Sequence, residues 1–317
     1  MITVLYVNHG LANQCGVRDF GIRHHAVMAQ TKKFCVHYAE VDSWETYLAA
    51  YSLCQPDTVI FNYMAIVMPW LDDRVRTLPA VRVVVQHLYD PKSVTAIMES
   101  YKGLFDYMVC LDPDLTSPDH RIFFCGRPIH TFDVPKLKLP TGKNPVQIGS
   151  FGFGMPHKQF PLIMREINRC FDHAVFNLHM TVGDFVGDYS PGILSACLAE
   201  ITKPGIKLNH TSEYLDEADI IEKLSRNHMN ALFYSLPPDN AGRSSSLDYM
   251  IAAQRPVLVT DCGSFKHAYN GTYVYPHVSF DTIAGNYQWC ASASVDLYER
   301  NVGRLLHDTE KMLEAVT

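Results

Sequence analysis

The residue types most able to bind a charged ligand are concentrated in residues 239–261, which read DNAGRSSSLDYMIAAQRPVLVTD. The apolar run after the serines is typical of a helix leading into a buried strand, so the serines would lie where that helix begins. One hydroxyl is enough to cap a helix, whereas Ser244, Ser245 and Ser246 supply three. Arg243 adds a planar cation that suits phosphate oxygens. A capped structural helix would explain the serines, but a diphosphate bound at the helix start would explain Arg243 as well.

Two further residues of this stretch favour a nucleotide ligand. Gly242 lets the backbone approach a ligand closely, because glycine carries no side chain. Asp248 follows one turn into the helix, where its carboxylate could accept both hydroxyls of a ribose, as an acidic residue does in dinucleotide sites.

A glycine-rich loop follows another predicted strand. The apolar residues 146–151 lead into GFGMPHKQF at residues 152–160. Gly152 would allow close backbone approach, and Lys158 falls near the expected start of the next helix. A cation is unfavourable there because of the helix dipole, so this lysine indicates a clamp for the phosphate groups of a ligand.

Two predicted strands of the first half also end in polar residues. Gly16 lies in the strand-to-helix segment HGLANQCGVRDF at residues 9–20, where free N–H groups could bind an anion. His87 ends a buried strand and could bind substrate or transfer a proton. A tight turn at Gly16 and a core histidine at position 87 are the structural alternatives.

The segment LDPDL at residues 111–115 offers two carboxylates after a further strand. Asp112 and Asp114 could hold a divalent cation through hard oxygen ligands. The proline between them is more typical of a turn whose carboxylates cap the local backbone, so we predict no metal site.

Alternating strands and helices would position all these loops. Valine-rich apolar runs, typical of strands buried on both faces, occupy residues 3–9, 33–41, 57–64, 81–88, 106–112, 146–151, 176–182, 230–236 and 256–261. Helical patterns occupy residues 18–32, 43–54, 93–105, 161–171, 218–227 and 294–316. This alternation predicts an α/β fold of two Rossmann-like, doubly wound domains facing across a cleft, with ligands at the carboxyl ends of the strands.

The segment at residues 130–146, HTFDVPKLKLPTGKNPV, interrupts the alternation and is typical of a linker. We therefore expect four parts, which are an N-terminal domain at 1–135, a linker at 136–145, a C-terminal domain at 146–293 and a closing helix at 294–317.

The composition bounds the class of protein. The chain has 317 residues, 47% hydrophobic and 19% charged, with a net charge of −6, which is typical of globular proteins and not of basic nucleic-acid binders. No apolar run approaches the roughly 18 residues of a membrane-spanning helix, and the first residues lack the features of a signal peptide. The nine cysteines form no CxxC motif, so we expect reduced thiols and a cytoplasmic location.

With these motifs the chain resembles a glycosyltransferase of the GT-B fold, closest to the retaining family 4 type. The likeness is strongest in IGSFGFGMPHKQF and GRSSSLDYMIAAQRPVLVTDCGSFKH, and the amino half resembles the family mainly in layout. The resemblance implies transfer of a sugar from a nucleotide-sugar donor to an acceptor hydroxyl, with the donor bound in the C-terminal domain and the acceptor in the N-terminal one.

The resemblance also assigns roles to residues of this sequence. Gly16 corresponds to the glycine near the donor phosphate, His87 to the histidine near the transferred sugar and Lys158 to the basic residue that holds the diphosphate. Asp239 and Asp248 resemble the two acids of the family's E-x7-E signature, near the sugar and on the ribose. Here both acids are aspartate, eight residues separate them, and the arginine expected shortly before the lysine is missing.

The implied mechanism is electrostatic. Lys158, Arg243 and the helix-start amides would stabilise the leaving diphosphate without a metal or another cofactor, and configuration at the sugar would be retained. The donor would be a UDP- or GDP-sugar.

Several alternatives stay open at this stage. A GT-A transferase would use Asp112 and Asp114 with manganese. An epimerase would act on the sugar nucleotide alone, and a binding protein would hold it without catalysis. The acceptor could be a saccharide, a lipid-linked sugar, a protein or a hydroxylated DNA base, the last of which would need base flipping and a basic groove.

Overall fold

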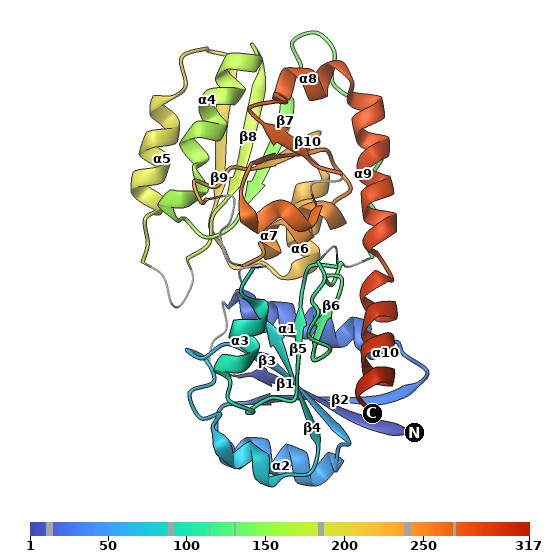
Figure 1. Cartoon of the computed structure of the whole chain (residues 1–317). Helices are drawn as coiled ribbons and strands as arrows, with labels where there is room; N and C mark the ends of the chain where they lie inside the picture. The colour runs from blue at the N-terminus through green and yellow to red at the C-terminus, as the bar shows by residue number, and fades with distance from the viewer. Residues whose placement is uncertain are drawn as a thin grey trace. The chain divides into compact units, whose positions relative to one another are not determined.

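The computed structural model describes residues 1–10, 15–87, 92–113, 115–129, 131–182, 187–237, 242–268 and 271–317. The described residues form two compact units. The first holds residues 1–128, 242–243 and 301–317, and the second holds residues 129–237 and 244–300. In both units helices flank a parallel sheet, which confirms the predicted α/β class (Figure 1).

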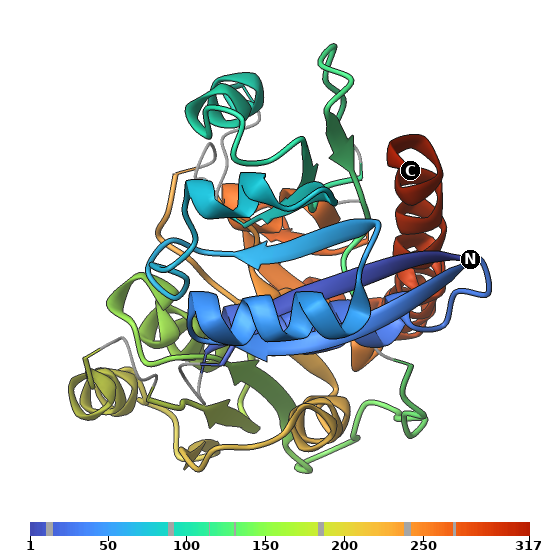
Figure 2. The same ribbon diagram turned by 90° about the horizontal axis from the view of Figure 1, so that it is seen from below.

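The first unit contains a six-stranded parallel sheet in the order β2-β1-β3-β4-β5-β6 (Figure 2). Its strands are β1 (Ile2–His9), β2 (Phe34–Val41), β3 (Thr58–Tyr63), β4 (Val81–Gln86), β5 (Tyr107–Cys110) and β6 (Ile122–Phe124). Its helices are α1 (Gly16–Met28), α2 (Trp44–Cys54), α3 (Val94–Ser100) and α10 (Arg304–Val316), with a 3-10 turn at Asp73–Thr77.

Helices cover both faces of this sheet. Successive side chains of β1 point to opposite faces, so Leu5 packs in one cluster and Tyr6 in another. The Leu5 cluster includes Tyr47 of α2, and the Tyr6 cluster includes Phe20 of α1 and Leu313 of α10. Burial on both faces explains why these strands are almost continuously apolar.

The predicted closing helix at 294–316 is two helices in the structure. One is α9 (Tyr287–Asn301) and the other is α10 (Arg304–Val316). Gly303 separates them with a φ of 83°, a left-handed conformation that a continuing helix does not allow. The second helix contributes Leu305 to the core of the first unit.

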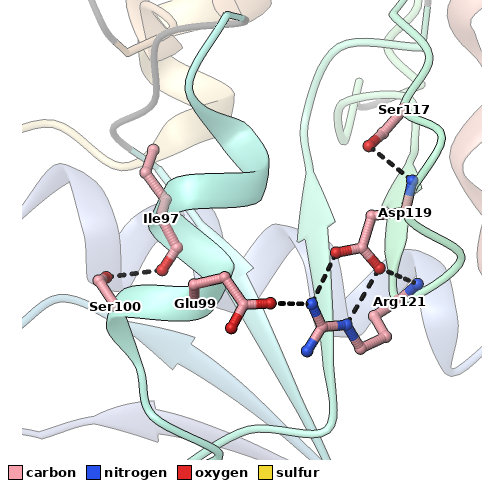
Figure 3. Close-up of polar contacts among 6 residues, drawn as sticks. All are labelled: Ile97, Glu99, Ser100, Ser117, Asp119 and Arg121. Atoms are coloured by element: carbon pink, nitrogen blue, oxygen red, sulfur yellow. Dashed lines mark hydrogen bonds and ion pairs between the residues drawn. The ribbon is translucent and has the colours of Figure 1, made fainter.

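An ion-pair cluster connects α3 to the turn before β6 (Figure 3). Arg121 pairs with Glu99 of α3, and its Nη2 lies 2.8 Å from Oδ2 of Asp119. The backbone N–H of Asp119 donates to the Ser117 hydroxyl, which closes the turn. The hydrogen-bonded guanidinium lowers the pKa of Asp119 to about 2, so the pair stays charged over the whole physiological range.

The second unit contains a six-stranded parallel sheet in the order β12-β11-β10-β7-β8-β9 (Figure 1). Its strands are β7 (Val146–Phe151), β8 (Ala174–His179), β9 (Ile206–Thr211), β10 (Met229–Leu232), β11 (Val257–Thr260) and β12 (Tyr273–Tyr275). Its helices are α4 (Phe160–Cys170), α5 (Ser190–Ala199), α6 (Glu217–Ser225), α7 (Ser245–Ala252), α8 (Phe280–Gly285) and α9, with 3-10 turns at Pro156–Lys158 and Gly263–Ala268.

The two faces of the second sheet differ in chemistry. One face is apolar, and Ile148 packs there in a cluster with Ile163 of α4. Near α6 the amides of Asn227 and Asn230 lie against Gly149 of β7, and a Cβ at that glycine would lie 2.1 Å from Asn227 Nδ2 and 2.3 Å from Asn230 Oδ1. Glycine is therefore required here by space.

In the part of the chain that the structure describes, no helix is both long and apolar enough to cross a membrane. The sequence patterns missed the strands β6, β9 and β12 and the helices α5 and α8.

Replacing Gly149 by alanine should destabilise the second unit, because the new methyl group would displace two buried amides. We expect the free energy of unfolding to fall by roughly 1–3 kcal/mol, measured by urea denaturation followed by circular dichroism. Gly192→Ala in α5 is the matched control, since a Cβ there meets nothing within 4 Å, and it should leave stability unchanged or raise it. Equal stability of the two variants would contradict this account of Gly149.

Candidate functional site

Lys158 lies in a buried position directly after the glycine-rich loop. It ends the 3-10 turn Pro156–Lys158, and its side chain passes back toward Gly152, so that the residue is 7% exposed. Its Nζ lies 5.6 Å from the ring centroids of Phe153 and of Tyr234. No carboxylate within the described ranges pairs with this ammonium. A buried cation without an anion is costly, so the position suits an anionic ligand.

Gly152 makes room for the lysine. Its φ is 140°, a conformation that favours glycine, and a Cβ there would lie 2.2 Å from Lys158 Nζ and 3.3 Å from Ser246 Oγ. The Lys158 ammonium and the Ser246 hydroxyl therefore both lie next to the space that a side chain at position 152 would occupy. We call Gly152, Lys158 and Ser246 the anion cradle.

The serine segment joins the cradle through a tyrosine. The hydroxyl of Ser244 is 3.1 Å from that of Tyr234, whose ring lies beneath Lys158. Ser244 is the N-cap of α7, but its side chain makes no capping hydrogen bond. The hydroxyl of Ser244 therefore does not cap α7, because it is bonded to the tyrosine instead.

Asp248 lies in the first turn of α7 and is 1% exposed. The next residue, Tyr249, packs its ring edge-on against Phe151 at 5.4 Å between centroids. Phe151 precedes Gly152, so Asp248 and the cradle lie close together in the second unit. The contact of Asp248 with a ribose stays a prediction.

A cavity of about 400 Å³ opens next to the cradle between the sheet and α6. Phe151 and His179 line it, with their rings stacked at 5.8 Å and 10°, and the N–H of Gly152 donates to the carbonyl of His179. Amides of Asn177 and Asn209 add hydrogen-bonding groups to its wall. An aromatic surface beside amide groups suits a planar, polar ligand.

Arg243 is engaged in the first unit. Its Nη2 lies 2.8 Å and its Nε 3.2 Å from Oδ2 of Asp112, and the two side chains are 2% and 5% exposed. A buried guanidinium needs a buried counter-charge, and Asp112 supplies it. Asp112 thus has a structural role, and direct contact of Arg243 with a diphosphate stays a prediction.

His87 directly follows β4 in the first unit and is partly exposed. Its Nε2 lies 2.6 Å from Oδ1 of Asn62, and the ring of Phe20 meets it edge-on at 4.9 Å. Burial lowers the pKa of His87, and together with the smaller effect of the nearby Arg127 it brings the pKa to about 3. The imidazole is therefore neutral at physiological pH and can form hydrogen bonds without donating a proton as an acid.

Gly16 is the first residue of α1, after the N-cap Cys15. A Cβ at Gly16 would meet nothing within 4 Å, so no described residue requires a glycine here. The sulfur of Cys15 lies 3.3 Å from Nε2 of His9, a pair that the sequence did not suggest.

Two predicted acids, Asp239 and Asp114, lie outside the residues that the structure describes. Within the described ranges, no group of three or more histidine, cysteine, aspartate or glutamate side chains could hold a metal ion. Four of the predicted binding residues, Gly152, Lys158, Ser244 and Ser246, come together in the second unit.

Sequence reasoning missed several residues of these sites. Tyr234 and Phe153 surround the lysine, and Asn62 binds His87. Asn62 carried a visible signal, since a buried apolar strand rarely contains an amide without a polar partner.

No protein-family model matches the sequence, and no curated protein matches it. Among solved structures the chain is similar to HepE from Anabaena in complex with UDP-glucose, with 10% identity, 99% of each chain covered and a TM-score of 0.65. It is similar to a glycosyltransferase from Rickettsia africae, with 11% identity, 99% of this chain and 97% of that one covered, and a TM-score of 0.64. S. aureus TarM in complex with UDP is a further match, at 13% identity, 84% and 58% coverage and a TM-score of 0.56.

These similarities show a shared fold. The chain has the GT-B architecture of two Rossmann-like units, which confirms the fold inferred from the sequence.

Removing the partner of Arg243 should destabilise the protein. Asp112→Ala would leave a buried guanidinium without its carboxylate, and we expect a loss of roughly 3–5 kcal/mol in the free energy of unfolding, measured in urea. Glu222→Ala is the control, because its pair with Arg226 has side chains 49% and 69% exposed and should contribute about 0.5 kcal/mol. A loss no larger than that of the control would mean that the ion pair is not the reason for the burial of Arg243.

Proposed function

We propose that this protein is a glycosyltransferase that takes a sugar from a nucleotide-sugar donor and transfers it to an acceptor hydroxyl. The observation that carries the proposal is the buried ammonium of Lys158 beside Gly152 and Ser246. This cradle suits a diphosphate, and it occurs in a fold shared with HepE, which has been solved in complex with UDP-glucose.

The chemistry follows from the charge that develops. When the bond between sugar and phosphate breaks, the leaving diphosphate gains negative charge, and a fixed cation in a water-poor site stabilises that charge strongly. Lys158 supplies the cation and Ser246 a hydroxyl donor. We therefore propose transfer without an essential metal, and with retention of configuration on the basis of the family resemblance.

The nucleoside would occupy the cavity beside the cradle. Phe151 and His179 offer it a stacked aromatic wall, and the mutually bonded amides of Asn177 and Asn209 make the wall polar. We propose a UDP-sugar as the donor, in view of the UDP bound to HepE and TarM. Asp248 remains our proposal for the ribose.

The first unit would provide the groups near the transferred sugar. We propose that His87 binds the sugar as a neutral imidazole and that Gly16 leaves space for the donor phosphate. Asp239 is proposed near the sugar from the resemblance alone. The acceptor would bind to the first unit.

All nine cysteines are free thiols, and six of them are buried. This pattern supports our proposal of a reducing, cytoplasmic location.

Binding of UDP and UDP-glucose should raise the melting temperature of the purified protein, because both would bind only the folded state. We expect a shift in a thermal denaturation assay that is the same with manganese and with EDTA. Lys158→Met should weaken UDP binding by roughly tenfold or more in calorimetry, because a charge-assisted hydrogen bond contributes about 1.5–3 kcal/mol.

Lys203→Met is the control for that variant, since Lys203 pairs with Asp172 on the surface and should leave UDP affinity unchanged. No shift with UDP, GDP or their glucose conjugates would contradict a nucleotide-sugar site. A shift that needs manganese would contradict the metal-independent mechanism alone.

Gly152→Ala tests the geometry of the cradle. The added methyl group would lie 2.2 Å from Lys158 Nζ, and the φ of 140° would be strained for alanine, so the ammonium must move. We expect UDP affinity to fall by about as much as in Lys158→Met, with the fold retained by circular dichroism. Unchanged affinity would show that the ligand does not use this position.

A further inference from the structure

Two buried amides lie side by side near the carboxyl ends of neighbouring strands in the first unit. Asn8 of β1 and Asn62 of β3 are both 0% exposed, one residue beyond the paired residues Val7 and Phe61. The Nδ2 of Asn62 donates to Oδ1 of Asn8 at 2.9 Å. A buried, mutually bonded amide pair has few alternative arrangements, because every unsatisfied polar atom would cost free energy.

Backbone carbonyls determine which way each amide faces. Asn62 Nδ2 is 2.7 Å from the carbonyl of Val17, and Asn8 Nδ2 is 2.9 Å from that of Arg18. A carbonyl oxygen only accepts hydrogen bonds, so both contacting atoms must be the NH2 groups. The Oδ1 of Asn62 is then directed to His87, and an amide oxygen also only accepts.

This arrangement determines the tautomer of His87. Its Nε2 lies 2.6 Å from the accepting oxygen of Asn62, so Nε2 must carry the hydrogen. In a neutral imidazole only one of the two ring nitrogens carries a hydrogen. Nδ1 is therefore unprotonated and can accept a hydrogen bond. Within the described residues, Nδ1 of His87 has no hydrogen-bond partner.

The surroundings keep the ring neutral. Among the described residues, the ionisable groups that act on His87 are Arg127 after β6, His24 of α1 and His9 of β1, and all three disfavour the imidazolium. Phe20 of α1 covers the ring with an edge-on contact. No carboxylate acts on it from these elements.

The helix α1 can lie over the amide pair only because of a glycine. A Cβ at Gly21 would lie 2.4 Å from Asn62 Nδ2 and 2.6 Å from Asn8 Cγ. Gly21 thus allows the carbonyls of Val17 and Arg18 to reach the two amides.

We propose that Asn62, oriented by Asn8 and the first turn of α1, is a positioning residue that holds His87 as a neutral imidazole protonated on Nε2. His87 then presents a hydrogen-bond acceptor, and the group that it binds must be a donor. If His87 faces the transferred sugar, as the proposed function has it, that group is a sugar hydroxyl and not a phosphate or carboxylate oxygen.

The first test uses the unaltered protein, labelled with 15N-histidine, and a long-range 1H–15N spectrum with His87 assigned through His87→Gln. We expect a protonated Nε2, an unprotonated Nδ1 and no titration of this ring between pH 5 and 8. A protonated Nδ1, or a titration midpoint above about pH 5.5, would overturn the proposal. Because no nucleotide is added, this result is independent of whether the protein is a transferase.

The second test exchanges the amide for a carboxylate of the same shape. Asn62→Asp still accepts from Nε2, but its charge favours the imidazolium, so the pKa of His87 should rise by about one unit or more. A midpoint within about 0.3 unit of the original would mean that residue 62 does not contact the ring in solution, and would overturn the positioning role.

Asn168→Asp is the matched control. Asn168 accepts from the backbone N–H groups of Thr202 and Lys203 in the second unit, and an aspartate can accept the same bonds. The signals of His87 should not change in this variant. If Asn62→Asp does not fold, the tautomer observed in the unaltered protein decides the proposal.

Discussion

Every candidate site in this chain depends on the common direction of its strands. All strand pairs in both sheets are parallel, so their carboxyl ends collect at one edge of each sheet. Asn8, Asn62 and His87 come together at one such edge, although they are far apart in the sequence. Phe151 and His179 do the same in the second unit. Loops after the strands can then vary in chemistry while the buried strands keep them in place.

Close packing of polar groups in these sheets is made possible by glycine. Gly21, Gly149 and Gly152 each occupy a position where a methyl group would overlap a side-chain nitrogen. In each case the nitrogen belongs to a buried polar group, either an amide or the Lys158 ammonium. Glycine loses more backbone entropy on folding than other residues, which lowers stability. At these positions it also allows polar contacts that a larger residue would prevent.

The sequence predicted the central strands and the cradle because both have local signals. Apolar runs mark β1, β3 and β4, and a contiguous motif carries Gly152 and Lys158. The predicted strands were all continuous apolar runs, and β9 contains no such run. Its sequence, IKLNHT, alternates apolar and polar residues at its start, as suits a strand with one exposed face. The pairing of Arg243 with Asp112 and the role of Asn62 depend on residues brought together only by the fold, and one sequence holds no signal for such contacts.

Because α10 packs in the first unit, it affects the order in which the two units can fold during synthesis. Leu305, Met312 and Leu313 complete a cluster whose other members come from β1, α1 and the strands that follow. Until α10 has been synthesised, only α1 covers this apolar face of the amino-terminal sheet, and the cluster stays incomplete. The core of the second unit contains no residue of α10, so this unit can fold before α10 is made. The first unit, whose synthesis begins earlier, therefore completes its core later.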